Sequence, residues 1–261
     1  MPDRLSILDV PFDRTTLDEA LERLNQLCEH QGQAYWVTPN PEICLESLHN
    51  PDFLKALQNA DFSIPDGFGI LWAARYLHGK KGFFRWMWTL LTPHLTRKRG
   101  VFPERVTGTD LMKEFCQRYP RRRVFLLGAH PDVNERLFQQ LKKQGVNVVG
   151  HYSGDASEKQ EPIIREMVRS SEAEVLFVAF GAPKQELWIA RNLSQIPELR
   201  VAIGVGGAFD FLAGERKRAP QWMRRCGLEW LFRVVIEPRR IKRIFRATVI
   251  FPWKVWRKSV H

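Results

Sequence analysis

The chain lacks long apolar runs and has few cysteines. No stretch reaches the roughly 18 apolar residues of a transmembrane helix, and the N-terminus, MPDRLSILDVPFDRTT, lacks the basic and apolar regions of a signal peptide. The cysteines form no CxxC pair; they are Cys28, Cys44, Cys116 and Cys226. We therefore expect neither a disulfide framework nor a zinc ribbon, and a reducing cytoplasm fits this pattern best.

Short motifs of several enzyme classes are also missing. The sequence contains no GxxxxGK[ST], HExxH or GxSxG segment, and no DxD pair of the kind that holds a metal-diphosphate in many sugar transferases. The glycine-rich run GVGGAFD at residues 204–210 is not a GxGxxG fingerprint, and no acidic residue stands in a following strand about 20 positions on. We therefore expect no nicotinamide-dependent dehydrogenase, no metal site and no cofactor.

Acidic residues are scarce in two segments of an otherwise ordinary globular composition. Residues 214–261 hold fourteen Lys or Arg and three Glu, and residues 80–105 hold seven Lys or Arg and one Glu. Because the formal net charge of the whole chain is +11, the remainder is mildly acidic. Such basic segments require an anionic partner, which is a phosphate-bearing ligand, an acidic membrane or a nucleic acid. No helix-turn-helix or RRM pattern is present, so we do not expect nucleic-acid binding.

Short apolar runs alternate with helical periods from about residue 15 to 210. Strands are expected at 35–37, 61–64, 124–127, 146–149, 175–180 and 201–205. Helices are expected at 16–30, where Thr16 and Glu19 form a capping-box pattern, and at 42–49, 69–77, 110–119, 132–144, 158–170 and 184–193. This alternation predicts an α/β fold with a mostly parallel sheet and helices on both faces, over a domain of residues 1–213.

Two segments interrupt the alternation. Residues 80–101 place large aromatic side chains between basic clusters, in a stretch too short to span a bilayer. In the helical appendage at 214–261, apolar residues follow helical spacing between Pro238 and Pro252 while Arg and Lys cover the remaining surface. Both patterns are typical of helices at an anionic membrane surface, here through residues 80–101 and 239–258. A core helix with solvated flanks and a solvated helix packed on the body remain the alternatives.

Ligands of doubly wound sheets bind beyond the carboxyl ends of the strands, so polar residues there are the first candidates. These candidates are Thr38, Asn40, Asp66, Gly128, His130, Gly181, Lys184, Gln185, Glu186 and the run 204–210. Asp66 precedes Gly67 and a predicted helix, so the pattern fits a helix cap as well as a functional carboxylate. The backbone amides of residues 204–210 are able to hold a phosphate.

Seven short segments follow one another in a specific order. They are TPNPE at 38–42, PDGFG at 65–69, RVTGTDL at 105–111, GAPKQE at 181–186, GVGGAFDF at 204–211, KRAP at 217–220 and GLEW at 227–230. Together they resemble the WecG/TagA/CpsF family, glycosyltransferase family 26, over about residues 35–245. The resemblance implies a Rossmann-like, inverting transferase at the cytoplasmic face of the bacterial inner membrane. It implies transfer from a UDP-sugar to an undecaprenyl-diphosphate-linked saccharide in cell-surface polysaccharide synthesis, with an N-acetylmannosamine-type sugar, or alternatively glucose or a uronic acid.

The resemblance also implies roles for individual residues. Asp66 corresponds to the general base, and Thr38 and Asn40 to the active-site threonine and asparagine. The arginines of the appendage that close over the donor diphosphate correspond to Arg233, Arg240 and Arg243. Further substrate-binding positions are Gly67, Arg105, Gly128, Lys184, Gln185, Gly206, Gly207, Asp210 and Arg218. Without a DxD pair, arginines and a helix N-terminus would stabilise the leaving diphosphate, so we expect metal-independent transfer.

The chain departs from the family pattern in residues 80–101, where family members have a much shorter link. This insertion is placed to contact either the lipid or the glycan of the acceptor. A non-catalytic, basic membrane-binding protein is the competing function, although it would have no use for the TPN and PDG segments at strand ends. The sequence leaves open whether the protein is a homo-oligomer.

Overall fold

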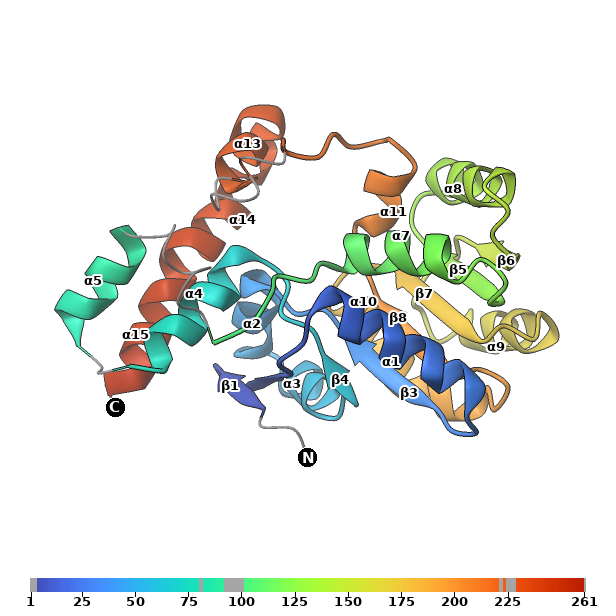
Figure 1. Cartoon of the computed structure of the whole chain (residues 1–261), viewed down its shortest axis with the longest axis horizontal. Coiled ribbons are helices and arrows are strands. Elements are labelled where there is room, and N and C mark those ends of the chain that lie inside the picture. The colour runs from blue at the N-terminus through green and yellow to red at the C-terminus, as the bar shows by residue number, and fades with distance from the viewer. Residues whose placement is uncertain (1–3, 80–81, 92–100, 221–222, 224–228, 261) are drawn as a thin grey trace.

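The computed structural model describes residues 4–79, 82–91, 101–220, 223 and 229–260. Its centre is a six-stranded parallel sheet with the strand order β4-β3-β8-β7-β5-β6, and a separate antiparallel hairpin pairs β1 with β2 (Figure 1). The strands are β1 (Leu5–Ile7), β2 (Val10–Phe12), β3 (Ala34–Val37), β4 (Phe62–Ser63), β5 (Val124–Gly128), β6 (Val148–Tyr152), β7 (Val175–Ala179) and β8 (Val201–Gly204). The predicted α/β, Rossmann-like class is confirmed.

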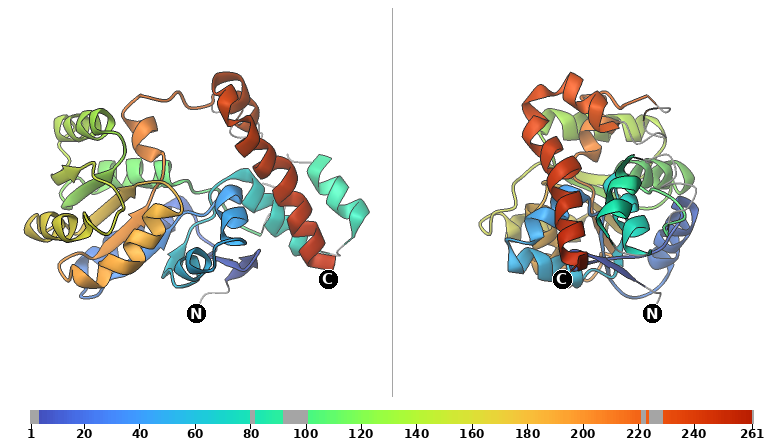
Figure 2. Two further views of the ribbon diagram at one scale, coloured as in Figure 1. Left: turned by 180° about the vertical axis from the view of Figure 1, so that it is seen from behind. Right: turned by 90° about the vertical axis from the view of Figure 1, so that its left-hand side faces the viewer.

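Helices cover both faces of this sheet (Figures 1 and 2). They are α1 (Leu17–Glu29), α2 (Pro41–Ser47), α3 (Pro51–Gln58), α4 (Phe68–Leu77), α5 (Phe83–Leu91), α7 (Gly108–Arg118), α8 (Pro131–Lys143), α9 (Glu161–Ser170), α10 (Lys184–Asn192), α11 (Ala208–Leu212), α13 (Glu229–Ile236), α14 (Ile241–Phe245) and α15 (Phe251–Val260). The predicted capping box of α1 is present: the Glu19 backbone N–H donates to Thr16 Oγ1 and the Thr16 backbone N–H donates to the Glu19 carboxylate.

The alternating side chains of each strand divide the core into two layers. On β3, Tyr35 and Val37 join the apolar cluster that includes residues of α2, α3, α4 and α10. Trp36, between them, joins the opposite cluster with residues of α1, α7 and α8. Because successive side chains of a strand point to opposite faces, a strand that is buried throughout requires helices on both sides of the sheet.

The structure corrects the expected start of β6 at residue 146. Val146 instead completes the C-terminus of α8, where its N–H donates to the carbonyl of Leu141 and the N–H of Gly145 donates to Lys142. Gly145 has φ +80°, the left-handed conformation of such helix ends. The buried Val146 therefore resembles a strand residue in the sequence although it belongs to a helix cap, and β6 begins two residues later.

The appendage packs against the body of the protein. Phe251 and Val255 of α15 are buried in the same apolar cluster as residues of α2 and α4. A π-helical segment, Arg246–Ile250, joins α14 to α15, and Pro252 is the second residue of α15. The division of the chain into domains at residue 213 stays a prediction.

The two basic aromatic segments lie side by side at the end of the molecule opposite β6 and α9 (Figures 1 and 2). The indole N–H of Trp86 on α5 donates to the carbonyl of Pro252 at 3.0 Å, and the Trp86 and Trp256 ring centroids are 6.2 Å apart. None of the helices in the described ranges has the length and apolar character that a bilayer span needs.

Candidate active site

The loops that follow β3, β4 and β8 meet at the carboxyl edge of the sheet. The Thr38 hydroxyl, after β3, donates to the carbonyl of Gly204 at the end of β8, at 2.9 Å. The Asp66 backbone N–H, after β4, donates to the carbonyl of Pro39 at 3.1 Å. The structure therefore brings the predicted residues Thr38 and Asp66 to one edge, as expected for strands that run parallel.

Asn40 begins helix α2. Its Oδ1 accepts the backbone N–H groups of Glu42 at 2.9 Å and Ile43 at 3.1 Å, as an N-cap residue does. Among the described residues its amide nitrogen has no hydrogen-bond partner, so this nitrogen is available to donate to a ligand. Gly67 adopts φ +95° between Asp66 and α4, a conformation that favours glycine, and so turns the chain away from the sheet edge directly after Asp66.

Arg218 lies in a group of acidic side chains at this edge. Its guanidinium donates to both carboxylate oxygens of Asp110, at 2.5 and 2.7 Å, and to Thr107 Oγ1 at 3.2 Å. Thr107 also caps α7 by accepting the backbone N–H of Asp110. The negative charges of Glu229 and Asp66 act on the same guanidinium. Arg218 is therefore held in a fixed orientation by a two-pronged ion pair with Asp110.

The Asp110–Arg218 pair remains ionised. Burial alone would raise the pKa of Asp110, but the hydrogen bonds and charge of Arg218, with smaller effects of Thr107 and Arg105, hold it below its ordinary value. Burial alone would lower the pKa of Arg218, but Asp110, Glu229 and Asp66 raise it. Both groups keep their charges across the physiological pH range.

A second ion pair connects the body to the appendage. Arg105 Nη1, in the loop before α7, lies 3.1 Å from Glu229 Oε2 at the start of α13. Sequence reasoning named Arg105 and Arg218 as substrate-binding residues but missed their partners Asp110 and Glu229. The only signal for these partners was their position inside the RVTGTDL and GLEW segments.

Gln185 is buried behind the site and does not reach its surface. Only 2% of the residue is exposed, and its Oε1 accepts the backbone N–H groups of Gly181 at 3.2 Å and Gly206 at 3.1 Å. Its Nε2 donates to the carboxyl group of Glu186 at 2.8 Å. Gln185 therefore connects the loops after β7 and β8, and its predicted role in substrate binding stays a prediction.

The remaining predicted positions lie along the same edge. Gly128 has φ +98°, and a Cβ there would lie 2.8 Å from the carbonyl carbon of Ala179, so glycine permits β5 to end closely beside β7. Gly206 and Gly207 precede α11. On this helix, the Oδ2 atom of Asp210 lies 3.6 Å from the Nη1 atom of Arg216. Lys184, at the start of α10, is exposed. The hydrogen bonds of Ser157 lower the pKa of Asp155, and the positive charge of Lys184 adds to this effect.

The predicted arginines of the appendage differ in their surroundings. Arg243 pairs with Glu42, two residues beyond Asn40, through contacts of 2.7 and 2.5 Å. Arg240 lies 2.7 Å from Glu237 of its own segment. The side chain of Arg233 lies outside the described residues, although its backbone belongs to α13. Arg243 is thus held near the TPN segment. Among the described residues, no group of three His, Cys, Asp or Glu side chains is arranged to hold a metal ion.

A Rossmann-like sheet with carboxylates and arginines at its carboxyl edge is the framework of an enzyme that binds a phosphate-bearing ligand. The sequence profile of the glycosyl transferase WecG/TagA/CpsF family matches residues 5–102 and 92–261. The chain belongs to this family, and the predicted enzyme class, a glycosyltransferase, is confirmed.

Curated relatives match most of the chain. The N-acetylglucosaminyldiphosphoundecaprenol N-acetyl-beta-D-mannosaminyltransferase of Staphylococcus aureus is 28% identical over 257 residues, which are 97% of this chain and 92% of the relative. The enzyme of the same name from Bacillus spizizenii is 30% identical over 215 residues, 81% of this chain and 74% of its own. The Bacillus subtilis enzyme is 28% identical over 243 residues, 92% of this chain and 86% of its own.

Proposed function

We propose that the protein transfers N-acetylmannosamine from a UDP-sugar to N-acetylglucosaminyl-diphosphoundecaprenol. The names of its relatives support the transferred sugar and the acceptor. The observation that carries the proposal is the position of Asp66 at the carboxyl edge of the sheet, in the electrostatic field of Arg218 and beside the loop of Thr38 and Asn40. Transfer of glucose or a uronic acid is the alternative within the same family.

The reaction we propose is a single displacement. The Asp66 carboxylate accepts the proton of the acceptor hydroxyl while the hydroxyl oxygen bonds to the anomeric carbon and the bond from that carbon to the UDP oxygen breaks. Attack from the face opposite the leaving group inverts the anomeric centre. General-base catalysis of this kind contributes about 10²–10⁴-fold. The amide nitrogen of Asn40 is available to orient the acceptor.

Departure of UDP adds negative charge at the diphosphate, and positively charged groups near the sheet edge are suited to stabilise it. We assign this to the backbone N–H groups before α11 and to arginines of the appendage, with Arg243 held nearby by Glu42. The Arg105–Glu229 pair would hold the appendage over the donor. In this mechanism arginines replace a divalent ion, so transfer does not require a metal.

We further propose that the protein binds the anionic, cytoplasmic face of the membrane through residues 80–101 and 239–258. Support comes from α5, where 82% of Phe84 and 61% of Trp88 are exposed. The appendage exposes a row of apolar residues spaced four apart, consisting of Ile241, Phe245, Val249 and Trp253. Because α5 packs against α15, both apolar surfaces belong to one end of the protein, as a shared membrane contact requires.

A transfer assay with purified protein tests the activity. The acceptor is a soluble, short-chain N-acetylglucosaminyl-diphospho-lipid, and UDP-N-acetylmannosamine, UDP-glucose and the UDP-linked uronic acid are compared as donors. We expect efficient transfer with UDP-N-acetylmannosamine, and undiminished transfer after dialysis against EDTA. Transfer of glucose alone would establish the alternative, and strict restoration by Mg²⁺ or Mn²⁺ would overturn the assignment of the arginines. Absence of transfer from every donor would overturn the proposed activity.

A further inference from the structure

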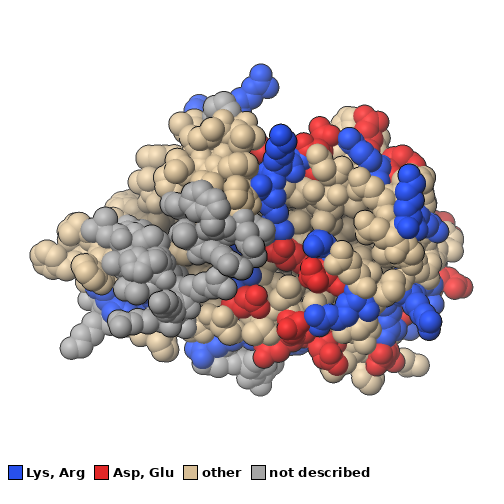
Figure 3. Space-filling view, turned by 45° about the horizontal axis from the view of Figure 1, so that its top comes forward, with Lys and Arg blue, Asp and Glu red and all other residues tan. Residues whose placement is uncertain are grey.

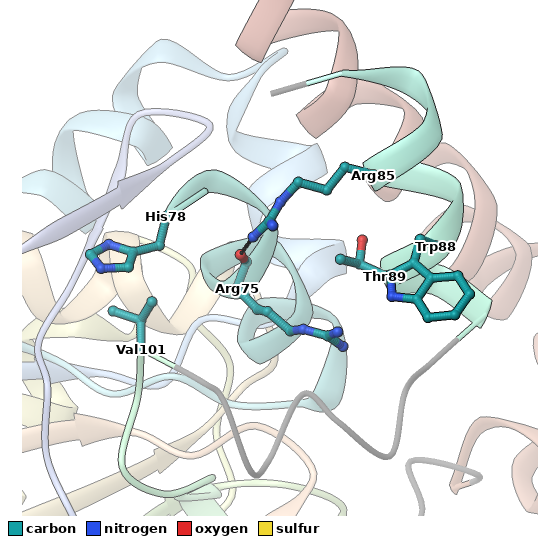
Figure 4. Close-up of a pocket in the computed structure, with 6 residues that line it drawn as sticks. All are labelled: Arg75, His78, Arg85, Trp88, Thr89 and Val101. Atoms are coloured by element: carbon teal, nitrogen blue, oxygen red, sulfur yellow. Dashed lines mark hydrogen bonds between the residues drawn. The ribbon is translucent and has the colours of Figure 1, made fainter. Parts of the chain in front are cut away.

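Polar side chains lie below the surface in different parts of the molecule. Between α4 and α5, the Nη2 atom of Arg85 donates to the carbonyl oxygen of Arg75 at 3.1 Å and joins the two helices (Figure 4). Behind the carboxyl edge of the sheet, Glu186 of α10 is only 1% exposed. It directly follows Gln185, whose side chain connects the loops after β7 and β8. Glu186 is therefore the buried group that touches the framework of the candidate site.

No basic side chain balances the carboxyl group of Glu186 within the described residues. Figure 3 shows acidic and basic side chains interspersed over the sheet half of the molecule, but the groups that act on the Glu186 carboxyl are the side chain of Gln185 and its own backbone. The Nε2 atom of Gln185 donates to the Oε1 atom of Glu186 at 2.8 Å. The Tyr35 hydroxyl donates to the backbone carbonyl of Glu186 at 3.4 Å, and not to its carboxyl group. The hydrogen bond from Gln185 is therefore the one through which this carboxyl group acts on the loops.

The side-chain amide of Gln185 has two chemically different ends. Its Oε1 atom accepts the backbone N–H groups of Gly181 at 3.2 Å and Gly206 at 3.1 Å, while its Nε2 atom donates to Glu186. An amide turned by about 180° would direct its NH₂ group at these two N–H donors, so both hydrogen bonds to the loops would be lost. The acceptor oxygen of Glu186 therefore selects the orientation in which Gln185 holds both loops.

The two loops depend on this contact because of their glycine residues. Gly181 has φ +77° and Gly206 has φ +53°, and since glycine adopts many conformations, a hydrogen bond to each N–H restricts its loop. Gln185 also lies against the end of β8, because a Cβ at Gly204 would lie 2.7 Å from its Nε2 atom. The carbonyl of Gly204 accepts the hydroxyl of Thr38. The amide of Gln185 is therefore part of the same strand end that binds Thr38.

We propose that Glu186 is a positioning residue for donor binding, which accepts the amide N–H of Gln185 and so fixes the orientation in which Gln185 holds the loops after β7 and β8. The glycine-rich loop after β8 contains the backbone N–H groups that we assign to the donor diphosphate. Glu186 thus acts on the donor through Gln185 without contacting it. The identity of the ligand rests on the proposed function, whereas the link from Glu186 to the loops rests on the observed hydrogen bonds.

Glu186→Met, Gln185→Met and the double variant test this inference, with UDP binding measured by calorimetry and amide exchange of Gly181 and Gly206 by NMR. Methionine approximates the length of both side chains but offers no oxygen acceptor. We expect Glu186→Met to weaken UDP binding about tenfold, equivalent to 1.4 kcal/mol, and to speed exchange of both amides. In the Gln185→Met background, Glu186→Met should have no further effect, because the two residues act as a unit. Additive losses, or unchanged UDP binding in Glu186→Met, would overturn the inference.

Three further variants separate positioning from damage to α10. Glu186→Gln keeps an oxygen that accepts the Gln185 N–H, so its UDP binding should stay near that of wild type; a loss as large as in Glu186→Met would contradict the role of the acceptor. Glu186→Asp withdraws the carboxyl group by one methylene and replaces Glu186→Met if that variant does not fold; wild-type binding by Glu186→Asp would overturn the inference. Asn192→Leu is the matched control, since Asn192 is buried on the same helix and accepts a hydrogen bond from Arg165 at 2.7 Å. An equal loss of UDP binding in Asn192→Leu would attribute the effect to damaged packing and overturn the inference.

Amide exchange distinguishes a failure of this inference from a failure of the proposed function. A wild-type protein that neither binds UDP nor transfers a sugar would overturn the proposed function, and faster exchange at Gly181 and Gly206 in Glu186→Met would still establish the link to the loops. Transfer by the wild type, together with unchanged exchange in Glu186→Met, would overturn this inference and leave the proposed function standing.

Discussion

The carboxyl edge of the sheet and the α5–α15 end of the molecule present different kinds of side chain. At the sheet edge, Arg218 has Asp110 as its partner and Arg105 has Glu229. At the α5–α15 end, 82% of Phe84 on α5 and 41% of Trp253 on α15 are exposed. Paired charges fix the geometry of a site, whereas exposed apolar side chains among basic ones are typical of a surface that contacts a membrane. We therefore expect changes at the sheet edge to alter transfer, and changes at the α5–α15 end, which we call the attachment region, to alter membrane binding.

Asp66→Asn should have the largest effect, because it removes the only proton acceptor that we assign at the sheet edge. The amide keeps the shape of the side chain but cannot accept the proton, so kcat should fall by about 10²-fold or more. Donor binding, measured by calorimetry with UDP, and the thermal unfolding midpoint should change little. A variant that retained more than about a tenth of the wild-type kcat would show that another group is the base.

Asp110→Asn tests whether matched charges position Arg218. The variant removes one carboxylate from a charged, two-pronged hydrogen bond, which is worth about 1.5–3 kcal/mol, so kcat/KM should fall roughly 10- to 100-fold. Asp110→Glu should restore part of the loss. Glu114→Gln, on the same helix α7, is the matched control because its carboxylate contacts only Lys113 among the described residues. Equal losses in both variants would indicate damage to α7 and not to the position of Arg218.

Phe84→Ser tests the attachment region. Burial of a Phe side chain contributes about 1.5–3 kcal/mol, so binding to phosphatidylglycerol vesicles in co-sedimentation should weaken by about tenfold. Ile163→Ser is the matched control, since Ile163 is 57% exposed on α9 at the other end of the molecule. Wild-type binding should decrease with added salt, and Arg239→Gln should reduce this salt dependence because each basic residue contributes about 1 kcal/mol. Equal binding to neutral and anionic vesicles would contradict the role of charge.

Glu186, near the start of α10, contrasts with Asp110 in its pKa. The pKa of the Asp110 carboxyl group is lowered, whereas that of the Glu186 carboxyl group is raised. Burial raises the pKa of Glu186 from 4.5 to about 7, and the hydrogen bond from Gln185 offsets only part of this effect. Between pH 4.5 and about 7, the Glu186 carboxyl group therefore keeps its proton in the folded protein but loses it in the unfolded chain. Because the folded state binds more protons in this range, the free energy of unfolding should fall as pH rises from about 4.5 to 7.

Urea unfolding at pH 5, 6, 7 and 8 measures this smallest effect. The free energy of unfolding should fall by up to about 1.4 kcal/mol per pH unit from this group. Glu186→Gln, which cannot ionise, should lose this contribution, whereas Glu158→Gln, an exposed control, should keep it. Identical pH profiles for wild type and Glu186→Gln would show that Glu186 does not bind the proton in the folded state.

Much of the fold was predictable because its signals are local. Buried strands followed by amphipathic helices repeat along the chain, and the capping residues of α1 stand within one turn of each other. The hairpin β1–β2 and helices α3 and α11 were missed, since their three to eight residues are too few to establish a period. The candidate site was partly predictable, because Thr38, Asn40 and Asp66 follow strands, and parallel strands share one carboxyl edge.

What the sequence determined by itself was the class of fold, the sheet edge at which we place the candidate site, the family, and the concentration of basic residues in two segments. Only the tertiary structure decided that Arg218 pairs with Asp110 over 108 positions, that Gln185 is buried, and that α5 packs against α15. The physical reason is that periodicity and strand ends depend on neighbours along the chain. Ion pairs, burial and helix contacts depend instead on which distant side chains the completed fold brings within a few ångströms.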